Sequence, residues 1–239
     1  MMSYKGKFSA LGLCLAATLA CANVNAATTA TMTVSGSFIP AACNAELSNS
    51  GAVDYGTMNH SMLETASSGN TLVQLNHKKI TLTVNCDAAT TIGVIAQDNR
   101  SASKVALSST TFIDDYIGKS DLSTTGAVFG LGTVGSAKIG AYALTAVPED
   151  SSADGEAVSI IIKDTDSGNV WKSADAGGLF YPDGTRIVTV AEKGKIAPLA
   201  FTEMVMPLEI APAVQTKGVL GASSEVVLDG NATLSLVYL

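Results

Sequence analysis

Several segments of the chain alternate apolar and polar residues at successive positions, which is the pattern of a half-buried β-strand. In the segment 79–86 the even-numbered residues are Ile, Leu, Val and Cys, whereas the odd-numbered ones are Lys, Thr, Thr and Asn. The segments 36–43 and 232–239 alternate in a similar way. Further strands are predicted at 53–58, 91–96, 127–131, 139–147, 157–162, 186–191, 201–210 and 226–228.

Residues that favour tight turns separate these segments. Turns are predicted at 154–155, 166–168, 182–184 and 229–231, which contain Asp-Gly, Asp-Ser-Gly, Pro-Asp-Gly and Asp-Gly-Asn. Gly, Asn and Asp tolerate a positive φ, and Pro presets a bend. No window keeps a sustained 3.6-residue period, so short strands with frequent turns predict an all-β sandwich.

The charge balance excludes one large class of partner. The chain has 14 Lys and Arg against 21 Asp and Glu, a formal net charge of −7. Nucleic-acid binding depends on clustered basic residues that contact phosphates, so nucleic acid is not an expected partner. The 47% of hydrophobic residues instead suits a globular domain with a substantial core.

The first 26 residues have the features of a secretory signal peptide. Lys5 and Lys7 precede an apolar run at 8–22, and small residues stand before Ala27, where cleavage is expected. The run is short for a membrane span. Export predicts passage through the periplasm, and the remaining 27–239 have the length of one large domain.

A lipoprotein signal ending at Cys21 is the alternative, and it is disfavoured because Thr18 stands where such signals usually carry Leu. Cys14 and Cys21 leave with a cleaved signal, so Cys43 and Cys86 remain in an oxidising compartment. One disulfide between them is expected. The alternative is two free buried thiols.

These features, taken together, resemble one known family. Five features occur in order along the chain: the signal, the alternating segment 36–43, the cysteine pair, the segment 53–56 with the sequence Val-Asp-Tyr-Gly, and an alternating C-terminal segment with penultimate Tyr238. The chain in this respect resembles the chaperone-usher pilins, the subunits of bacterial fimbriae, and among them a subgroup of larger secreted proteins. The residues 97–220 are similar to that family only in their β character.

The resemblance implies an immunoglobulin-like sandwich that lacks one strand and is completed by a strand donated from a neighbour. It assigns 27–35 as the donor extension of this chain, with Ala30, Met32 and Val34 facing into the neighbour's groove, and 36–239 as the sandwich domain. With nine residues before Gly36, the donor extension is shorter than a complete donor strand is expected to be.

The resemblance also implies partners and a location. The C-terminal strand, through Leu234, Leu236 and Tyr238, would face a periplasmic chaperone and later the donated strand. An outer-membrane usher and neighbouring subunits of the same fibre are the other implied partners. The expected function is that of a structural subunit of a cell-surface fimbrium, with no cofactor, no metal and no catalytic residues.

Two sequence motifs match functional patterns, and each has a plainer interpretation. The segment 130–135, Gly-Leu-Gly-Thr-Val-Gly, matches a dinucleotide fingerprint with Glu149 beyond it, yet no helical pattern follows as that fold requires. A glycine-rich turn between strands is expected instead. The segment 164–169 is similar to a calcium loop, but its Gly stands one place early, so a hairpin turn between 162 and 170 is expected.

The alternative functions rest on weaker features. Trp171, Phe180 and Tyr181 are a candidate aromatic platform for a sugar, which would suit a fimbrial-tip adhesin or a secreted carbohydrate-binding protein with a host-surface ligand. A periplasmic enzyme is disfavoured because His60 and His77 show no metal-ligand spacing, and no Gly-x-Ser-x-Gly nucleophile motif occurs.

Overall fold

The structure is a computed structural model, and it describes residues 30–39, 41–117, 120–174, 176–221 and 225–239. The chain divides into two units, Met1–Ile39 and Pro40–Leu239. The predicted signal peptide at 1–26 and the first residues of the predicted donor extension, 27–29, lie outside the described residues. In the first unit the described residues 30–39 form neither strand nor helix, and their side chains are exposed.

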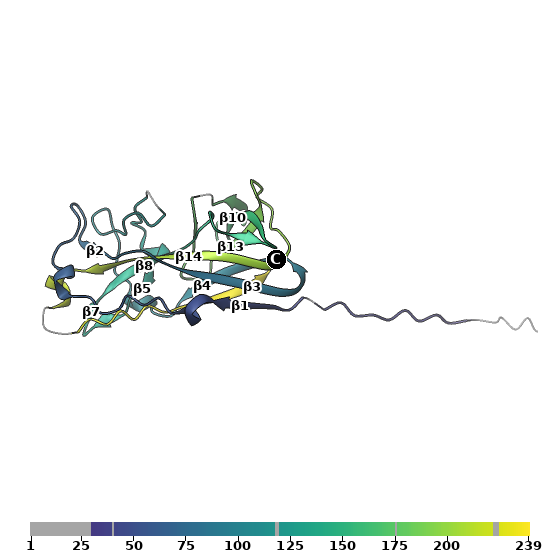
Figure 1. Cartoon of the computed structure of the whole chain (residues 1–239), viewed down its shortest axis with the longest axis horizontal. Helices are drawn as coiled ribbons and strands as arrows, with labels where there is room; N and C mark the ends of the chain where they lie inside the picture. The colour runs from purple at the N-terminus through teal and green to yellow at the C-terminus, as the bar shows by residue number, and fades with distance from the viewer. Residues whose placement is uncertain (1–29, 40, 118–119, 175, 222–224) are drawn as a thin grey trace, which may run out of the picture. The chain divides into compact units, whose positions relative to one another are not determined.

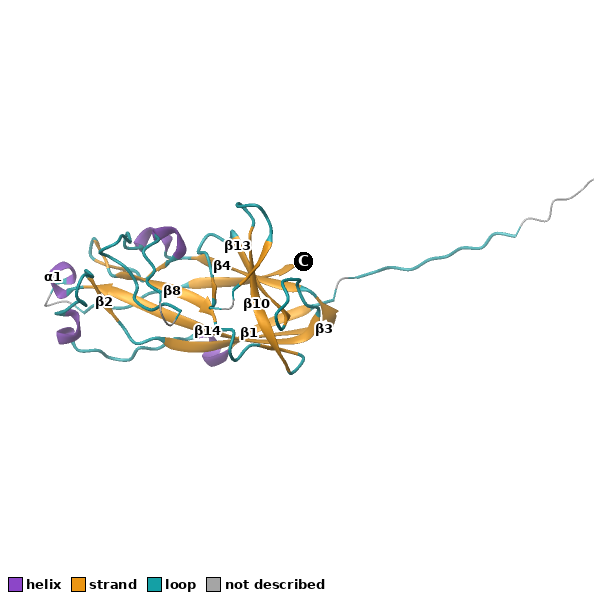
Figure 2. Cartoon of the chain, turned by 90° about the horizontal axis from the view of Figure 1, so that it is seen from above, coloured by secondary structure: helices purple, strands orange, loops and turns teal. Residues whose placement is uncertain are grey.

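The regular secondary structure of the second unit is almost all strand, with long loops between the strands, as Figure 2 shows. The strands are β1 Cys43–Leu47, β2 Leu72–Gln74, β3 Lys78–Thr90, β4 Ile92–Asp98, β5 Phe129–Gly130, β6 Thr133–Val134, β7 Ala137–Lys138, β8 Gly140–Ala146, β9 Ser152–Ala153, β10 Glu156–Asp164, β11 Trp171–Ser173, β12 Gly178–Leu179, β13 Arg186–Glu192, β14 Phe201–Gln215 and β15 Ala232–Tyr238.

Helical structure is confined to single turns. The helices are α1 Lys217–Leu220 and the 3-10 turns Ser48–Gly51, His60–Leu63, Ser101–Ser103 and Thr125–Ala127. None of the helices within the described ranges is long and apolar enough to cross a membrane.

Antiparallel pairing joins thirteen of the strands into a nearly closed sandwich. The order is β1-β3-β14-β9-β10-β13-β4-β15, with β11 beside β10, β2 and β8 beside β14, and β5 and β12 beside β8. The strands β6 and β7 form a separate hairpin. The all-β fold predicted from alternation and turn residues is therefore confirmed.

The long strand β14 organises one layer of the sandwich. Figure 1 shows it running beside β3 and then beside β8. Its first part, 201–210, pairs with β3, and 208–214 pair with β8 on the other edge. Because it has neighbours on both sides, its apolar residues lie in the core: Met204, Met206 and Leu208 are fully buried.

Seven predicted strands overlap observed ones, namely β3, β4, β8, β10, β13, β14 and β15. The predictions at 91–96, 139–147 and 232–239 extend past the observed strand by one residue at one or both ends. The segment 127–131 was predicted as a strand, and only Phe129–Gly130 pairs, because Thr125–Ala127 forms a 3-10 turn before it. The strands β2, β11 and β12 have two or three residues each, too few for an alternating pattern to be visible in the sequence.

The prediction of a strand at 53–58 was wrong. The Asp54 carboxylate accepts a hydrogen bond from the Gly56 backbone N–H at 2.7 Å, and Gly56 has a φ of +63°. This local side-chain turn replaces a β-ladder. The apolar residues Val53, Tyr55 and Met58 nevertheless pack, half-buried, against the core.

Two further local predictions were wrong. No strand forms at 226–228 and no turn at 229–231; these residues run as irregular chain into β15. Side-chain hydrogen bonds to 98–103, described below, hold this stretch in place of a ladder. The segment 36–43 was expected to be extended, and among its described residues only Cys43, the first residue of β1, is in a β-pair.

Two clusters of buried side chains stabilise the unit. The larger one fills the space between the layers and includes Leu82, Val94, Phe129, Ile160 and Val188. The smaller one lies under the loops of the middle region and is made by Leu72, Val105, Leu107, Ile113, Leu122, Ala127, Val128, Ala141, Ala143, Leu179, Ala211 and Ala213. The middle region therefore has a core of its own.

The predicted disulfide is confirmed. Cys43 and Cys86 are directly opposite residues in the register of β1 and β3, with Cα atoms 4.0 Å apart, and their sulfurs are bonded. The bond fastens β1, which ends the strand order, to the much longer β3.

We expect replacement of both cysteines by alanine to lower the free energy of unfolding by roughly 4 kcal/mol, because the bond closes a loop with a sequence separation of 43. Urea unfolding of the oxidised chain and of the double variant measures the difference. Reduced wild-type protein is the control and should unfold like the variant. A loss below about 1 kcal/mol would contradict the expectation.

Candidate functional site

The candidate site is a groove between the two strands that end the sheet order. In the described part of the chain β1 pairs only with β3, and β15 pairs only with β4. Each strand therefore has one edge whose backbone N–H and C=O groups make no β-ladder. Unpaired edges of this kind are templates for another strand.

The two edges lie beside one another and run in opposite directions. At one end the Cys43 backbone N–H donates to the Tyr238 hydroxyl at 3.3 Å. Further along, Leu47 and Leu234 line the same cavity. Residue numbers thus rise along β1 while they fall along β15.

Core-facing side chains on these edges are incompletely covered. Leu47 on β1 and Leu234 and Leu236 on β15 pack against the larger core cluster, yet each is only half-buried. Ala45, between the inward residues of β1, is exposed. Since these residues belong to the apolar faces of their strands, the core is open along the line between β1 and β15.

Three adjoining cavities form this opening, which we call the open groove. The middle cavity, of about 210 Å³, shares Leu47 and Leu234 with the cavity beside β1, and it shares Leu228 with a cavity beside the turn His60–Leu63. The open groove therefore runs between residues 45–63 on one side and 226–234 on the other.

The wall of the middle cavity is uncharged. Its lining consists of Leu47, Gly51, Val53, Tyr55, Ile80, Leu131, Tyr142, Leu144, Leu208, Ile210, Pro212, Leu228, Gly230, Asn231, Ala232 and Leu234. Burial raises the pKa of Tyr55 to about 12 and raises that of Tyr142 further, so both phenols are neutral at physiological pH. Such a surface suits apolar side chains.

One polar atom in this wall lacks a partner. The Tyr55 hydroxyl is buried and makes no hydrogen bond with any described residue. An unpaired buried hydroxyl costs about 1–3 kcal/mol. A main-chain group entering the groove would supply the missing partner.

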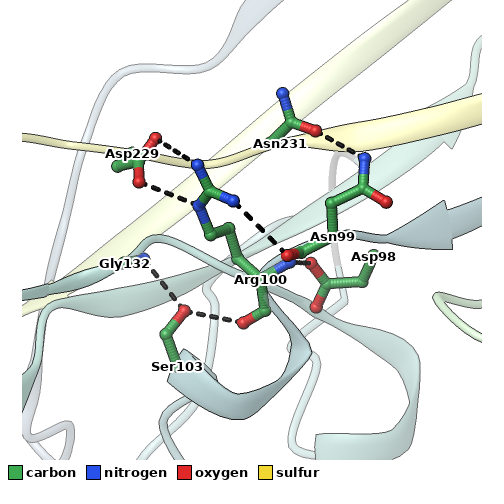
Figure 3. Close-up of polar contacts among 7 residues, drawn as sticks. All are labelled: Asp98, Asn99, Arg100, Ser103, Gly132, Asp229 and Asn231. Carbon is green, nitrogen blue, oxygen red and sulfur yellow. Dashed lines mark hydrogen bonds and ion pairs between the residues drawn. The ribbon is translucent and has the colours of Figure 1, made fainter.

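A set of polar contacts, drawn in Figure 3, holds the chain before β15 against the end of β4. The Arg100 guanidinium donates to both carboxylate oxygens of Asp229, at 2.8 and 3.1 Å. The Asn99 side chain donates to those of Asn231 and Thr233. We call these residues the rim latch, because they fix one wall of the open groove.

A second layer of bonds supports the rim latch. The buried Asp98 carboxylate accepts a hydrogen bond from the Arg100 backbone N–H, and the Ser103 hydroxyl accepts one from the Gly132 backbone N–H (Figure 3). The Asp98 carboxylate also accepts one from the Gly130 backbone N–H. A Cβ atom on Gly130 would lie 2.3 Å from the Arg100 carbonyl oxygen. The glycine is therefore needed for the two chain segments to approach.

The predicted site residues occupy two different places. Leu234, Leu236 and Tyr238 are on β15, as expected, with Leu234 in the groove wall. Ala30, Met32 and Val34 are in the exposed segment 30–39, where Met32 and Val34 are each 85% exposed. Their predicted pairing with a neighbouring molecule stays a prediction.

Sequence reasoning missed most of the groove wall. Tyr55 and Leu228 were assigned to strands, so their position beside the opening was not foreseen. Arg100 and Asp229 are 129 residues apart, and no pattern in the sequence indicates that they are in contact.

The two motif-like segments are hairpin elements. The segment 130–135 passes from β5 into the β6–β7 hairpin, so no helix follows its glycines. The segment 164–169 connects β10 to β11, and the Asp164 carboxylate is bonded to Arg186. The described residues contain no group of three His, Cys, Asp or Glu side chains that could hold a metal ion.

The candidate aromatic platform does not assemble. Phe180 is fully buried in the larger core, whereas Trp171 is half-exposed on β11 with the Lys163 ammonium 4.7 Å from its ring centre. Tyr181 instead stacks on the Arg186 guanidinium at 3.6 Å.

Comparisons with known proteins place the chain among bacterial relatives. Residues 32–143 match the family described as "Protein of unknown function (DUF1120)". Protein GltF of Escherichia coli (strain K12) is 31% identical over 255 aligned residues, which cover all of both chains. Uncharacterized protein YhcF of the same strain is 30% identical over 220 residues, 83% of this chain and 86% of YhcF. The chain therefore belongs to the same family as GltF and YhcF, and its residues 32–143 match the DUF1120 model.

Proposed function

We propose that this protein is a structural subunit of a bacterial surface fibre and that subunits join by donating a strand into one another's open groove. The observation that carries the proposal is an apolar groove between two unpaired strand edges, in a chain that also has an exposed alternating apolar segment. A strand added to a sheet edge gains main-chain hydrogen bonds, and its alternate side chains fill pockets.

The donor in this proposal is the segment 30–39. Its even-numbered residues are Ala, Met, Val, Gly and Phe, and the odd-numbered residues up to 37 are Thr, Thr, Ser and Ser. Met32, Val34 and Phe38 are 85%, 85% and 105% exposed. Burying one such side chain fully is worth about 1.5–3 kcal/mol. The exposed Phe38 extends the donor beyond residue 35, the end expected from the sequence.

The length of this segment suits the groove. Ten extended residues span about 33 Å, and the seven residues of β15 span about 23 Å. A single donor segment is thus long enough to pair with all of β15 and to continue past Ala232 toward the middle cavity.

The directions of the two edges define how the donor would insert. Because β1 and β15 run oppositely, an inserted strand is antiparallel to one and parallel to the other. Antiparallel pairing is the more stable per residue, and β15 is longer than β1. The donor is therefore expected to run antiparallel to β15, with its N-terminal end near Tyr238 and its C-terminal end near Ala232.

The open groove also explains the proposed partners. An apolar opening between unpaired edges promotes aggregation until it is covered. A periplasmic chaperone would cover it after export, and an outer-membrane usher would exchange the chaperone for the next subunit at the cell surface. In this role the chain acts by assembly and performs no chemistry.

The rim latch has a specific part in this proposal. The chain before β15 has no ladder on its groove side, so Arg100 and Asp229 must hold it while the groove is empty. The Arg100 hydrogen bonds lower the pKa of the Asp229 carboxyl below its ordinary value of 3.8. A carboxyl with a depressed folded-state pKa contributes stability above its ordinary pKa, and that contribution is lost as the pH falls through the folded value.

A synthetic peptide of residues 30–39, added to the chain from Ala27 onward, should stabilise it. At a free concentration one hundred times its Kd, the peptide would raise the free energy of unfolding by about 2.7 kcal/mol. Thermal unfolding measures the effect. A peptide with Met32, Val34 and Phe38 replaced by Ser is the control and should give no shift.

Adjacent positions on β15 supply a matched pair of variants for the same measurement. Leu234→Glu places a charge in the groove wall and should abolish the peptide effect, whereas Ser235→Glu, at the exposed position next to it, should preserve it. If the chain is a stable monomer that ignores the peptide, the proposal is wrong.

The substitution Asp229→Asn should destabilise the chain at pH 7. The difference from wild type should shrink as the pH falls below 3.8, the ordinary aspartate pKa, and disappear below the depressed pKa of the folded chain, where the wild-type carboxyl is protonated and as uncharged as the amide. Urea midpoints between pH 7 and 2 provide the measurement. Asp150→Asn, at an exposed aspartate with no side-chain hydrogen bond in the described residues, is the control. A difference that stays constant with pH would contradict the role of the ion pair.

A further inference from the structure

A second cavity lies in the middle region and shares no lining residue with the open groove. It has a volume of about 430 Å³ and lies between the loop of Tyr116, Leu122 and Thr124 and the strands β12 and β13. Ligand pockets commonly have volumes of about 300–1,000 Å³. Leu122 and Leu179 in its wall belong to the smaller core cluster, so the wall is supported from below.

A nearly buried arginine lines this cavity. The Arg186 side chain is 11% exposed and forms an ion pair with Asp164, which is 12% exposed. Its Nε and Nη2 donate to the two Asp164 oxygens, at 2.5 and 3.1 Å, and Nη1 donates to the Leu179 carbonyl at 3.3 Å. Its position is therefore fixed by three hydrogen bonds.

These bonds leave part of the guanidinium without a partner. Arginine has five N–H donors, and the three bonds use one each on Nε, Nη1 and Nη2. One N–H on each terminal nitrogen of Arg186 therefore makes no hydrogen bond with any described residue. Donors that are buried and unpaired in a cavity wall favour a ligand with acceptor oxygens.

Two tyrosines complete the polar part of the wall. The Tyr181 ring stacks on the Arg186 guanidinium, with 3.6 Å from the ring centre to Cζ. Burial raises the pKa of Tyr116, and the nearby Arg186 charge opposes this shift. Both phenols can donate and accept hydrogen bonds.

The rest of the wall is apolar or small. Ile162 and Leu179 are apolar, and Ala176 and Gly177 are small. A Cβ atom on Gly177 would lie 2.7 Å from the Thr145 methyl group and 2.9 Å from that of Ile117, and this glycine has a φ of +137°. The cavity thus combines an apolar surface with a group of hydrogen-bonding atoms.

We propose that this cavity binds a neutral saccharide unit, with a ring face on the apolar wall and hydroxyl oxygens accepting from Arg186 and bonding with Tyr116 and Tyr181. Because Asp164 already balances the Arg186 charge, the described lining residues offer no excess positive charge to an anion. The net charge of the chain, −7, also repels anionic ligands. A polyhydroxylated ring with an apolar face matches both parts of the wall.

The test is titration of the full chain from Ala27 onward with the methyl glycosides of mannose, galactose, glucose and N-acetylglucosamine, followed by calorimetry and NMR. We expect at least one glycoside to bind and to shift the amide signals of cavity residues. N-acetylneuraminic acid is the charged comparison and should bind more weakly. No binding by any neutral glycoside at tens of millimolar would overturn the proposal, and stronger binding of the acidic sugar would overturn its neutral assignment.

Variants at exposed positions avoid disruption of the buried ion pair. Ala176→Phe fills the cavity from an exposed position and should lower affinity at least tenfold, whereas Ala157→Phe, at an exposed position outside the cavity, should leave it unchanged. Tyr116→Phe should lower affinity about two- to twelvefold through the loss of one hydrogen bond. Unchanged affinity in Ala176→Phe would exclude this cavity as the binding site.

The two proposals fail independently. Because the cavity and the open groove share no lining residue, saccharide affinity should be the same with and without the peptide of residues 30–39. A chain that ignores the peptide and still binds a glycoside would retain this site while losing the strand-donation proposal.

Discussion

The rest of the structure depends on one constraint: the edges of β1 and β15 do not pair, so the core between them must be held without a paired strand. Between β1 and β15 the apolar faces end at half-buried Leu47 and Leu234, so the core there is bounded by a groove and not by a paired strand. Closing this line would bury apolar surface and satisfy two rows of backbone groups at once. This gain in free energy is the physical basis for strand donation. Any strand of suitable length and alternation could provide it, because such a strand would pair with the backbone groups of both edges and cover the exposed apolar side chains.

Each wall of the open groove is attached to the rest of the unit by a bond that does not depend on a donated strand. On the β1 side the bond is the Cys43–Cys86 disulfide, and on the β15 side it is the ion pair of Arg100 with Asp229. The two differ in strength: the disulfide is covalent, whereas the exposed ion pair is screened by salt and weakened by acid. The β15 wall is therefore the part of the groove that solution conditions can change.

The sequence predicted those strands whose alternating pattern lies within one segment and is long enough to recognise. Alternation over eight residues was enough to predict β3 and β15, and the expectation of export with two remaining cysteines was enough to predict the disulfide. The strand predicted at 53–58 does not form, because a hydrogen bond from the Gly56 backbone N–H to the Asp54 carboxylate makes a turn there. The groove wall and the rim latch could not be predicted, because they join residues more than 100 positions apart that carry no mutual signal.

The middle region explains why this chain is longer than its groove requires. Its loops cover the other side of β8 and β14 with a second apolar cluster, which buries Ala141, Ala143 and Ala211 from those strands. Small side chains on that face let the loops pack closely, and the loops in turn position Tyr116 opposite Arg186. Assembly and ligand binding would then use different surfaces of the same sheet, so that a subunit could bind a saccharide whether or not its groove is filled.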